Sequence, residues 1–222
     1  MTEAPIIGIH RHRLTTDGEG VTTLVGFWGC PLTCKYCLNP QSWKIKKCQT
    51  FTPQHLCNNV SIDQLYFLAT GGGITFGGGE PLLYPDFINE FRSICGDDWN
   101  ITLETSLNVP LKNLQKVCPS VNNYIVDIKD TNDEIYKKYT GKSNVQALEN
   151  LSWLVKEVGQ ESIMVRVPLI PNYNTPEDIE KSIKLLEEKG LKKFDKFSYT
   201  IHNLDKKLKP QSEEADNETD VH

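Results

Sequence analysis

The chain has 222 residues, of which 38% are hydrophobic and 24% charged, a composition typical of a globular protein with a buried core. Lys and Arg number 24 against 29 Asp and Glu, so the net charge is −5, whereas a nucleic-acid binder usually carries a basic excess. No signal peptide and no run of about 18 apolar residues is visible, so we expect a cytoplasmic protein with neither nucleic acid nor membrane among its partners.

Six short stretches rich in β-branched or aromatic residues predict β-strands. Their ranges are 21–27, 73–76, 100–104, 124–128, 163–168 and 196–200. Between them, apolar residues recur at helical spacing over 62–68, 87–94, 148–155 and 179–186. The last of these helices has the clearest start, because Thr175 supplies a capping hydroxyl before Pro176 and two carboxylates, and Gly190 ends it.

Strands and helices alternate six times, which predicts βα units and a parallel sheet. Such units form either a barrel or an open doubly wound sheet, and six are fewer than the eight of a closed barrel. We therefore expect an α/β fold, a partial (β/α)6 TIM-like barrel that is laterally open, with function at the carboxyl ends of its parallel strands. The expected domain spans residues 1–204, and residues 205–222 are predicted to form a disordered acidic tail.

Three of the seven cysteines lie close together, directly after the first predicted strand. Cys30, Cys34 and Cys37 have the spacing C-x3-C-x2-C, and thiolates spaced in this way suit zinc or an iron–sulfur cluster. A structural zinc site usually has four ligands in paired C-x2-C spacing, but the next cysteine, Cys48, lies eleven residues beyond Cys37. The spacing therefore favours a metal site with one open position, and an iron–sulfur cluster, zinc and unliganded thiols all remain as alternatives.

Flanking motifs separate these alternatives. Tyr36 precedes the last cysteine of the triplet, and residues 77–81, Gly-Gly-Gly-Glu-Pro, follow the second predicted strand. Both features resemble the radical S-adenosylmethionine (SAM) superfamily. Within it, Thr-Asp-Gly-Glu-Gly at 16–20 and Cys-Leu-Asn-Pro-Gln-Ser-Trp at 37–43 are similar to the activating enzymes of glycyl radical enzymes, as typified by pyruvate formate-lyase-activating enzyme. The resemblance covers nearly the whole expected domain.

The resemblance implies a [4Fe-4S] cluster on Cys30, Cys34 and Cys37, with SAM on the fourth iron. One electron, from flavodoxin or ferredoxin, would cleave SAM to a 5′-deoxyadenosyl radical, which abstracts a hydrogen from a backbone glycine of a partner glycyl radical enzyme. We expect this enzyme to be a monomer. The residues that the resemblance assigns to SAM are Tyr36, Leu38, Asn39, Gly78, Gly79, Glu80, Thr105, Ser106, Asp127, Lys129, Arg166 and His202.

Several of these assignments also have a chemical rationale. Glycines let a backbone approach a ligand closely, and Glu80 can accept a hydrogen bond from the SAM ammonium group. Alternation along a strand puts Asp127 and Lys129 on one face. The planar guanidinium of Arg166 matches a carboxylate. The sequence therefore predicts one polar SAM site at the strand ends.

The resemblance is incomplete after the third predicted strand. Glu104 and Leu107 replace the Asp and Gly that are usual there, and Glu104 is a candidate ligand of a monovalent cation. The Thr-Gly pair at 140–141 is a weaker match, which a plain turn would also explain. With no further cysteine motif, we expect one cluster and ordinary thiols at the four remaining cysteines, Cys48, Cys57, Cys95 and Cys118.

Other functions remain as alternatives. Radical SAM enzymes that act on a small molecule, such as 7-carboxy-7-deazaguanine synthase, resemble the cysteine loop but not Leu-Asn-Pro at 38–40 with Trp43. The activating enzyme of anaerobic ribonucleotide reductase shares the Asn and Trp but is shorter. A non-enzymatic zinc domain would need a fourth ligand, and none lies beside the triplet.

Overall fold

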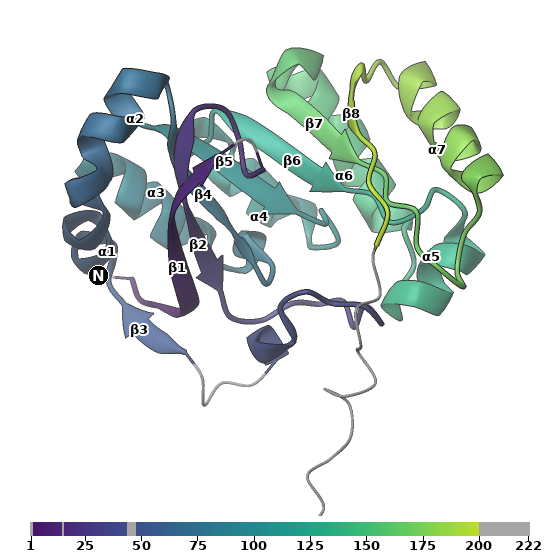
Figure 1. Ribbon diagram of the computed structural model, residues 1–222, viewed down its shortest axis with the longest axis horizontal. Helices are drawn as coiled ribbons and strands as arrows, with labels where there is room; N and C mark the ends of the chain where they lie inside the picture. Colours follow the sequence, from purple (N-terminus) through teal and green to yellow (C-terminus); the bar gives the residue numbers. More distant parts are fainter. Residues whose placement is uncertain (1, 15, 44–47, 200–222) are drawn as a thin grey trace, which may run out of the picture.

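The computed structural model describes residues 2–14, 16–43 and 48–199. Its centre is an eight-stranded sheet, and the helices lie along the outer side of this sheet (Figure 1). The strands are β1 (Ala4–Leu14), β2 (Val21–Phe27), β3 (Gln49–Phe51), β4 (Gly73–Gly78), β5 (Asn100–Thr105), β6 (Asn123–Asp127), β7 (Ile163–Arg166) and β8 (Lys193–Asp195). The α-helices are α1 (Pro53–Val60), α2 (Gln64–Thr70), α3 (Pro85–Cys95), α4 (Leu111–Val117), α5 (Asp133–Thr140), α6 (Val145–Val158) and α7 (Pro176–Glu188). Short 3-10 helices are η1 (Pro40–Trp43), η3 (Ser61–Asp63), η4 (Pro81–Leu83), η5 (Cys118–Ser120) and η6 (Gln160–Ser162).

Six strands run parallel, and helical connections join them. The sheet order is β3-β1-β2-β4-β5-β6-β7-β8, and β2, β4, β5, β6, β7 and β8 pair in parallel in that order. Within the described part of the chain, the edge strands β3 and β8 do not pair with each other. The expected α/β fold, a laterally open partial barrel with six parallel strands, is therefore confirmed.

The strand boundaries agree best in the middle of the sheet. β2 has the predicted limits, and β4 to β7 overlap their predicted ranges. The predicted strand at 196–200 is displaced, because β8 pairs with β7 at Lys193–Asp195 and only an isolated bridge joins Leu169 to Ser198. The antiparallel strands β1 and β3 have no predicted counterpart. Toward the two ends of the sheet, pairing with neighbouring strands decides the register, and local composition carries little of that information.

The longer helices follow the predicted periodicity. At the start of α7, the hydroxyl of Thr175 accepts from the Asp178 amide at 3.3 Å, while the Asp178 carboxylate accepts from the Thr175 amide at 3.0 Å, the expected capping box. The predicted segments 87–94 and 148–155 fall within α3 and α6, and 62–68 forms η3 and most of α2. The helices α1, α4 and α5 were not predicted, because seven or eight residues contain too few turns for a periodic signal.

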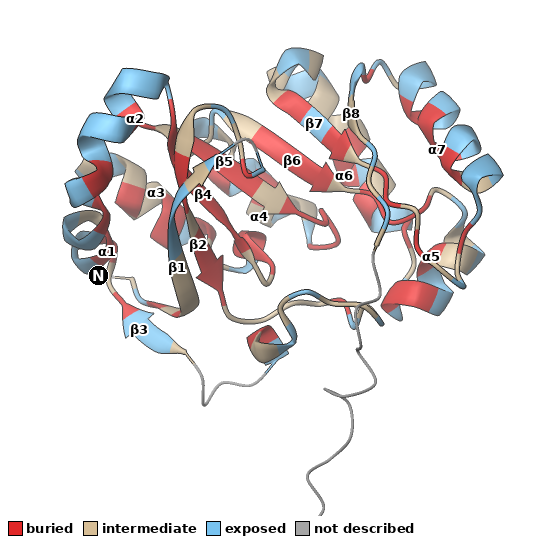
Figure 2. Cartoon of the chain, in the orientation of Figure 1, coloured by how far each residue is buried: buried red, intermediate tan, exposed pale blue. Residues whose placement is uncertain are grey.

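The two faces of the sheet differ in character. Phe76, Leu103 and Val126 point outward and are buried beneath the helices, whose outer sides are exposed (Figure 2). The neighbouring residues Thr75 and Thr102 point inward, and the hydroxyl of Thr75 donates to the carbonyl oxygen of Asp17 in the β1–β2 turn. The apolar core therefore lies between sheet and helices, while the inside of the barrel is polar.

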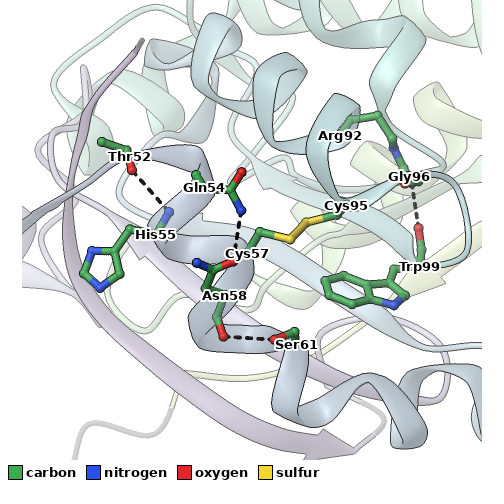
Figure 3. The surroundings of a disulfide bond; sticks show 10 residues. All are labelled: Thr52, Gln54, His55, Cys57, Asn58, Ser61, Arg92, Cys95, Gly96 and Trp99. Atoms are coloured by element: carbon green, nitrogen blue, oxygen red, sulfur yellow. Dashed lines mark hydrogen bonds between the residues drawn. A yellow bond between two sulfur atoms is a disulfide. The ribbon is translucent and has the colours of Figure 1, made fainter.

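Two of the scattered cysteines form a disulfide bond. Cys57 in α1 and Cys95 in α3 are bonded, with a Cα–Cα distance of 6.2 Å (Figure 3). The expectation of ordinary thiols is therefore wrong for this pair. The sequence separation of 38 residues hides a contact that arises because α1 and α3 pack against each other. Cys118 remains a thiol that packs against the core.

Two predictions concern parts of the chain outside the described residues. The domain end at residue 204 and the acidic tail at 205–222 both lie there, so they stay predictions. Among the helices that are described, none is long and apolar enough to cross a membrane.

Candidate active site

A cavity of about 100 Å³ lies at the carboxyl ends of the parallel strands. All three cysteines of the triplet line it, together with residues that follow β4, β5 and β6. Its lining comprises Cys30, Leu32, Cys34, Cys37, Leu38, Asn39, Gly78, Gly79, Glu80, Glu104, Thr105, Ser106, Asp127, Lys129 and Tyr199. Residues far apart in sequence thus converge at the end of the sheet where parallel α/β folds place their sites.

A larger cavity, of about 530 Å³, lies toward the amino ends of the parallel strands. Its walls come from the β1–β2 turn, at Gly18, and from the strands β5 to β8, at Thr102, Ile125 and Phe194. None of the described cysteines lines it. We therefore place the candidate active site in the smaller cavity, where thiols and charged groups meet.

The glycine segment after β4 holds the start of the cysteine loop, defined here as residues 28–39. The amide of Gly79 donates to Phe27 O at 2.9 Å, and the amide of Glu80 donates to Gly29 O at 2.7 Å. A Cβ atom on Gly79 would lie 2.1 Å from the Gly29 carbonyl oxygen. This glycine therefore permits close packing of two backbone segments, in addition to the approach of a ligand for which it was expected.

The C-terminal end of α5 holds the middle of the cysteine loop. Thr33 N donates to Thr140 O at 2.8 Å, and Lys35 N donates to Tyr139 O at 3.1 Å. Gly141 follows with a φ of 79°, and a Cβ atom there would lie 2.6 Å from the Thr33 hydroxyl oxygen. The Thr-Gly pair is thus part of the support of the loop. In Figure 1 the loop runs from the end of β2 along the lower side of the view toward α5.

The three thiols of the loop are partly buried, and this changes their acidity. Burial raises the pKa of Cys30 to about 12, and the nearby Glu80 carboxylate adds to the effect. Burial raises the pKa of Cys34 to about 11, against the opposing charge of Lys129, and burial also raises the pKa of Cys37. Without a metal the thiols hold their protons at neutral pH, so metal binding must release protons.

The donor set fits an iron–sulfur cluster. Thiolates are the ligands of such clusters, and in a [4Fe-4S] cluster each thiolate binds a separate iron. Here three thiols line one cavity. No three His, Cys, Asp or Glu side chains in the described ranges converge as ligands of one metal ion. The three thiols that share this cavity, one for each of three irons, fit a cluster with three protein ligands.

Asp127 and Lys129 face the cavity from the end of β6. Their side chains form an ion pair with an Nζ–Oδ2 distance of 3.0 Å, and Lys129 Nζ donates to the Tyr199 hydroxyl at 3.3 Å. Burial alone would lower the pKa of Lys129, but Asp127 and Tyr199 hold it well above its usual range. The second carboxylate oxygen of Asp127 is buried and has no hydrogen-bond partner among the described residues. A bound ligand with a donor group would satisfy it.

Glu80 also lines the cavity, and its carboxylate accepts hydrogen bonds from donors of the chain. Oε1 accepts from the Thr105 hydroxyl at 2.6 Å and from Leu82 N at 3.2 Å. Oε2 accepts from Ser106 N at 3.0 Å and from its hydroxyl at 2.7 Å. Burial raises the pKa of Glu80, while these bonds oppose the rise. The hydroxyls of Thr105 and Ser106, expected to face SAM, thus point to Glu80.

The loop after β5 has a strained residue at its centre. Leu107 has a φ of 55° and is fully buried, so it adopts the left-handed conformation for which the family's glycine is suited. The side-chain amide of Asn150, in α6, donates to Leu107 O and to Val109 O, both at 2.8 Å. Asn150 was not predicted, because an Asn within a helix can be recognised as a support only once the loop is seen beside it.

Arg166 lies at the end of β7 but does not line the cavity. Its guanidinium pairs with Glu104 at 2.7 Å and with Asp195 at 3.2 Å, and it also donates to the carbonyl oxygen of Thr16. All these partners belong to the chain. Oε1 of Glu104, the candidate cation ligand, is thus already paired with the guanidinium of Arg166.

The remaining expected residues lie at or near the cavity. Leu38 and Asn39 line it. The Tyr36 ring instead packs against Tyr139 and Tyr173, with centroid distances of 6.1 and 5.7 Å. Tyr199 was missed as a lining residue, although the predicted strand 196–200 contains it. His202 lies outside the described residues.

Several known proteins are similar to this chain in sequence. The model of the radical SAM superfamily matches residues 26–201. The chain is 31% identical over 220 residues to (2S)-3-sulfopropanediol dehydratase activating enzyme of Klebsiella oxytoca, covering 71% of this chain and 69% of the relative. It is 29% identical over 208 residues to pyruvate formate-lyase-activating enzyme of Clostridium pasteurianum, covering 87% and 84% of the two chains.

The fold recurs among solved structures at low sequence identity. SuiB of Streptococcus suis, bound to S-adenosylmethionine, superposes with a TM-score of 0.62 at 14% identity, over 82% of this chain. The match spans 43% of the SuiB chain, so it concerns the fold of one part of that protein. From the family match and the relatives, the chain belongs to the radical SAM superfamily and, within it, to the activating enzymes of glycyl radical enzymes.

Proposed function

We propose that this protein cleaves SAM reductively at a [4Fe-4S] cluster and uses the resulting 5′-deoxyadenosyl radical to take a hydrogen atom from a backbone glycine of a glycyl radical enzyme. The observation that carries the proposal is the cavity at the strand ends. Three thiols line it beside an Asp127 oxygen that lacks a hydrogen-bond partner among the described residues. The site thus offers soft ligands for iron and an acceptor for a polar ligand.

The residues of the chain would divide the work as follows. Cys30, Cys34 and Cys37 would hold three irons, and the wall formed by Gly78 and Gly79 would face SAM through its backbone. Asp127 would accept a hydrogen bond from SAM through Oδ1, while its Oδ2 stays paired with Lys129. Glu80 would keep that wall in place through Thr105 and Ser106. Tyr36 and Arg166, which do not line the cavity, would act from its rim. The assignment of His202, outside the described residues, rests on the family resemblance alone. Leu38 and Asn39 would close the mouth.

The partner class follows from the relatives. Their names refer to the activation of (2S)-3-sulfopropanediol dehydratase, pyruvate formate-lyase and indoleacetate decarboxylase. We accordingly propose a glycyl radical enzyme as the protein substrate, a flavodoxin or ferredoxin as the electron donor, and a monomer in the cytoplasm. The proposal includes no monovalent cation, since Arg166 already balances the charge of Glu104.

The test is an anaerobic assay of glycyl radical formation. The reconstituted protein, analysed for iron and sulfide, is mixed with SAM, a reductant and a candidate glycyl radical enzyme. Electron paramagnetic resonance should then show the doublet of a glycyl radical, together with 5′-deoxyadenosine. SAM cleavage without a doublet for any candidate would favour a small-molecule substrate. One zinc and no sulfide per chain would contradict the radical mechanism.

A further inference from the structure

Positive charge gathers on the outer side of the cysteine loop, although the chain as a whole has a net charge of −5. The sequence from residue 29 to residue 47 contains four lysines and no acidic residue. One of these, Lys35, lies in the described part, and its side chain is exposed. It is the residue directly after Cys34.

The end of α5 brings two more lysines to the same place. The amide of Lys35 donates a hydrogen bond to Tyr139 O. This places Lys35 beside Lys138, the residue before Tyr139. Lys142 lies two residues after Thr140, whose carbonyl oxygen accepts a hydrogen bond from the Thr33 amide of the loop. Lys138 and Lys142 are both exposed. Lys35, Lys138 and Lys142 together are called the lysine patch below.

The charges of the lysine patch are not neutralised within the described part of the chain. No ion pair with a described residue involves any of the three, whereas the neighbouring Lys137 pairs with Asp133 at 2.6 Å. Lys138 Nζ instead lies 5.7 Å from the centroid of the Tyr173 ring. A cluster of exposed like charges on an acidic protein attracts a partner of opposite charge.

The position of the patch indicates what kind of partner this is. None of the three lysines lines the cavity, so a protein held there does not have to insert a segment into the active site. It lies instead against the outside of the loop that carries the thiols. The Tyr173 ring beneath Lys138 contacts Tyr36, which is next to Cys37. A protein docked on this face is therefore close to the metal site without blocking it.

We propose that the lysine patch is the docking surface of a small acidic one-electron carrier protein that reduces the cluster. The inference rests on the proposed function, because it requires a cluster in the cysteine loop. In the transfer, one electron leaves the carrier and enters the cluster. For a flavin carrier the anionic hydroquinone becomes the neutral semiquinone, so no proton is exchanged. The glycyl radical enzyme must use the cavity mouth, so the two partners have separate places.

The experiment compares two triple variants of the reconstituted protein. The first is Lys35→Glu with Lys138→Glu and Lys142→Glu. The matched control has the same net charge and carries Lys112→Glu, Lys156→Glu and Lys184→Glu, which are exposed lysines of α4, α6 and α7 without an ion pair to a described residue. Calorimetry measures the affinity for oxidised flavodoxin. Stopped-flow absorbance measures electron transfer from flavodoxin hydroquinone, and photoreduced 5-deazariboflavin serves as a small neutral reductant.

For the patch variant we expect affinity and electron-transfer rate to fall about tenfold at low salt. The difference should shrink in about 0.5 M salt, where charges are screened within a few ångströms. Reduction by 5-deazariboflavin should be unchanged, and the control should behave like the unsubstituted protein. Equal flavodoxin affinity and rate in all three proteins would overturn the proposal. So would equal losses in patch and control variants, or a parallel loss with 5-deazariboflavin.

The two proposals fail in different ways. Iron and sulfide analysis, together with SAM cleavage driven by 5-deazariboflavin, tests the proposed function without any carrier protein. Flavodoxin affinity by calorimetry tests the docking surface without any turnover. A protein that forms the cluster and cleaves SAM but binds flavodoxin independently of the patch would overturn only the docking surface.

Discussion

Two groups of cysteines in this molecule differ in their bonding. Cys30, Cys34 and Cys37 lie on a strand-end loop and their thiols line a cavity, while Cys57 and Cys95 lie on two helices and are bonded to each other. The loop is fixed by backbone hydrogen bonds from the β4–β5 side and from α5. These bonds hold the thiols in place without giving them a covalent partner.

The difference shows what makes a cysteine a ligand in this fold. A disulfide needs only that two elements pack together with suitable Cα separation. A ligand set needs a backbone that keeps several thiols beside one cavity and apart from one another, and here that task falls to residues such as Gly79 and Thr140. Substitutions in the two groups, and in the residues that support them, should therefore have separable effects.

The largest effect is expected at the triplet itself. Cys34→Ala removes one of three proposed ligands, so the reconstituted protein should lose its full complement of iron and all detectable SAM cleavage. Cys118→Ala, a packed cysteine outside the cavity, should keep both. Iron and sulfide analysis and 5′-deoxyadenosine formation measure the outcome. A complete cluster in Cys34→Ala would refute the ligand assignment.

Glu80→Ala should be the most destabilising of the remaining changes. It leaves two buried hydroxyls and two amides without the carboxylate that accepts from them, and we expect a loss of about 4 kcal/mol in the free energy of unfolding. Urea denaturation measures it. Glu180→Ala, on the exposed side of α7, should change stability by less than about 0.5 kcal/mol. Equal stability of the two variants would mean that Glu80 does not support the wall.

Cys57→Ser tests the second group of cysteines. Opening a disulfide that spans 38 residues should lower the free energy of unfolding by about 3 kcal/mol, because the unfolded chain gains freedom. The iron content should not change, since neither cysteine of this pair lines the cavity. The stability difference should disappear when both proteins are measured with dithiothreitol. Loss of iron in this variant would contradict the separation of the two groups.

Gly141→Ala probes the support that α5 gives to the cysteine loop. Both Gly141 and Gly71 end a helix in the left-handed conformation, with φ values of 79° and 67°, but only at Gly141 would a Cβ atom meet the loop, 2.6 Å from the Thr33 hydroxyl. We expect Gly71→Ala to lose about 1 kcal/mol for the backbone alone and Gly141→Ala about 2 kcal/mol, with weaker iron binding. Urea denaturation and iron analysis compare them. Identical results for both would show that the contact with Thr33 is unimportant.

The smallest expected effect concerns pH. Burial raises the pKa of Glu80 above its ordinary value of 4.5, so the folded state holds this proton more tightly than the unfolded state. The stability that Glu80 contributes is fully present below pH 4.5 and is lost as the pH rises through the pKa that Glu80 has in the folded state. The Glu80→Gln variant has no ionisable group at this position. Its deficit in free energy of unfolding relative to the unsubstituted protein should therefore decrease as the pH rises. Urea denaturation at several pH values measures this deficit, and a deficit that widens with pH would contradict the shift.

The sequence was most informative where a pattern is local. Alternation and β-branched content located β2 and β4 to β7, and strand–helix alternation placed the site at the carboxyl ends. The spacing of Cys30, Cys34 and Cys37 singled out the candidate metal site. These features depend on neighbouring residues of one segment, so they can be read without knowing what packs against it.

Other features depend on residues that meet only in the folded chain. The disulfide between Cys57 and Cys95, the displacement of β8 and the contact of Asn150 with the β5 loop join elements far apart in sequence. Arg166 is an example of a motif residue whose partners, Glu104 and Asp195, no local pattern announces. The packing of distant segments against each other sets these contacts, and the local amino-acid composition does not determine them.

By itself, the sequence determined the fold class and the set of candidate ligands, because spacing and periodicity are properties of the chain, and its motifs carried the resemblance to the family. Only the tertiary structure decided which polar groups of the site find hydrogen-bond donors within the chain. It satisfied Glu80 with four donors of the chain and left one oxygen of Asp127 without a partner among the described residues. The two carboxylates are chemically alike, and what distinguishes them is which donors the fold brings within hydrogen-bond distance.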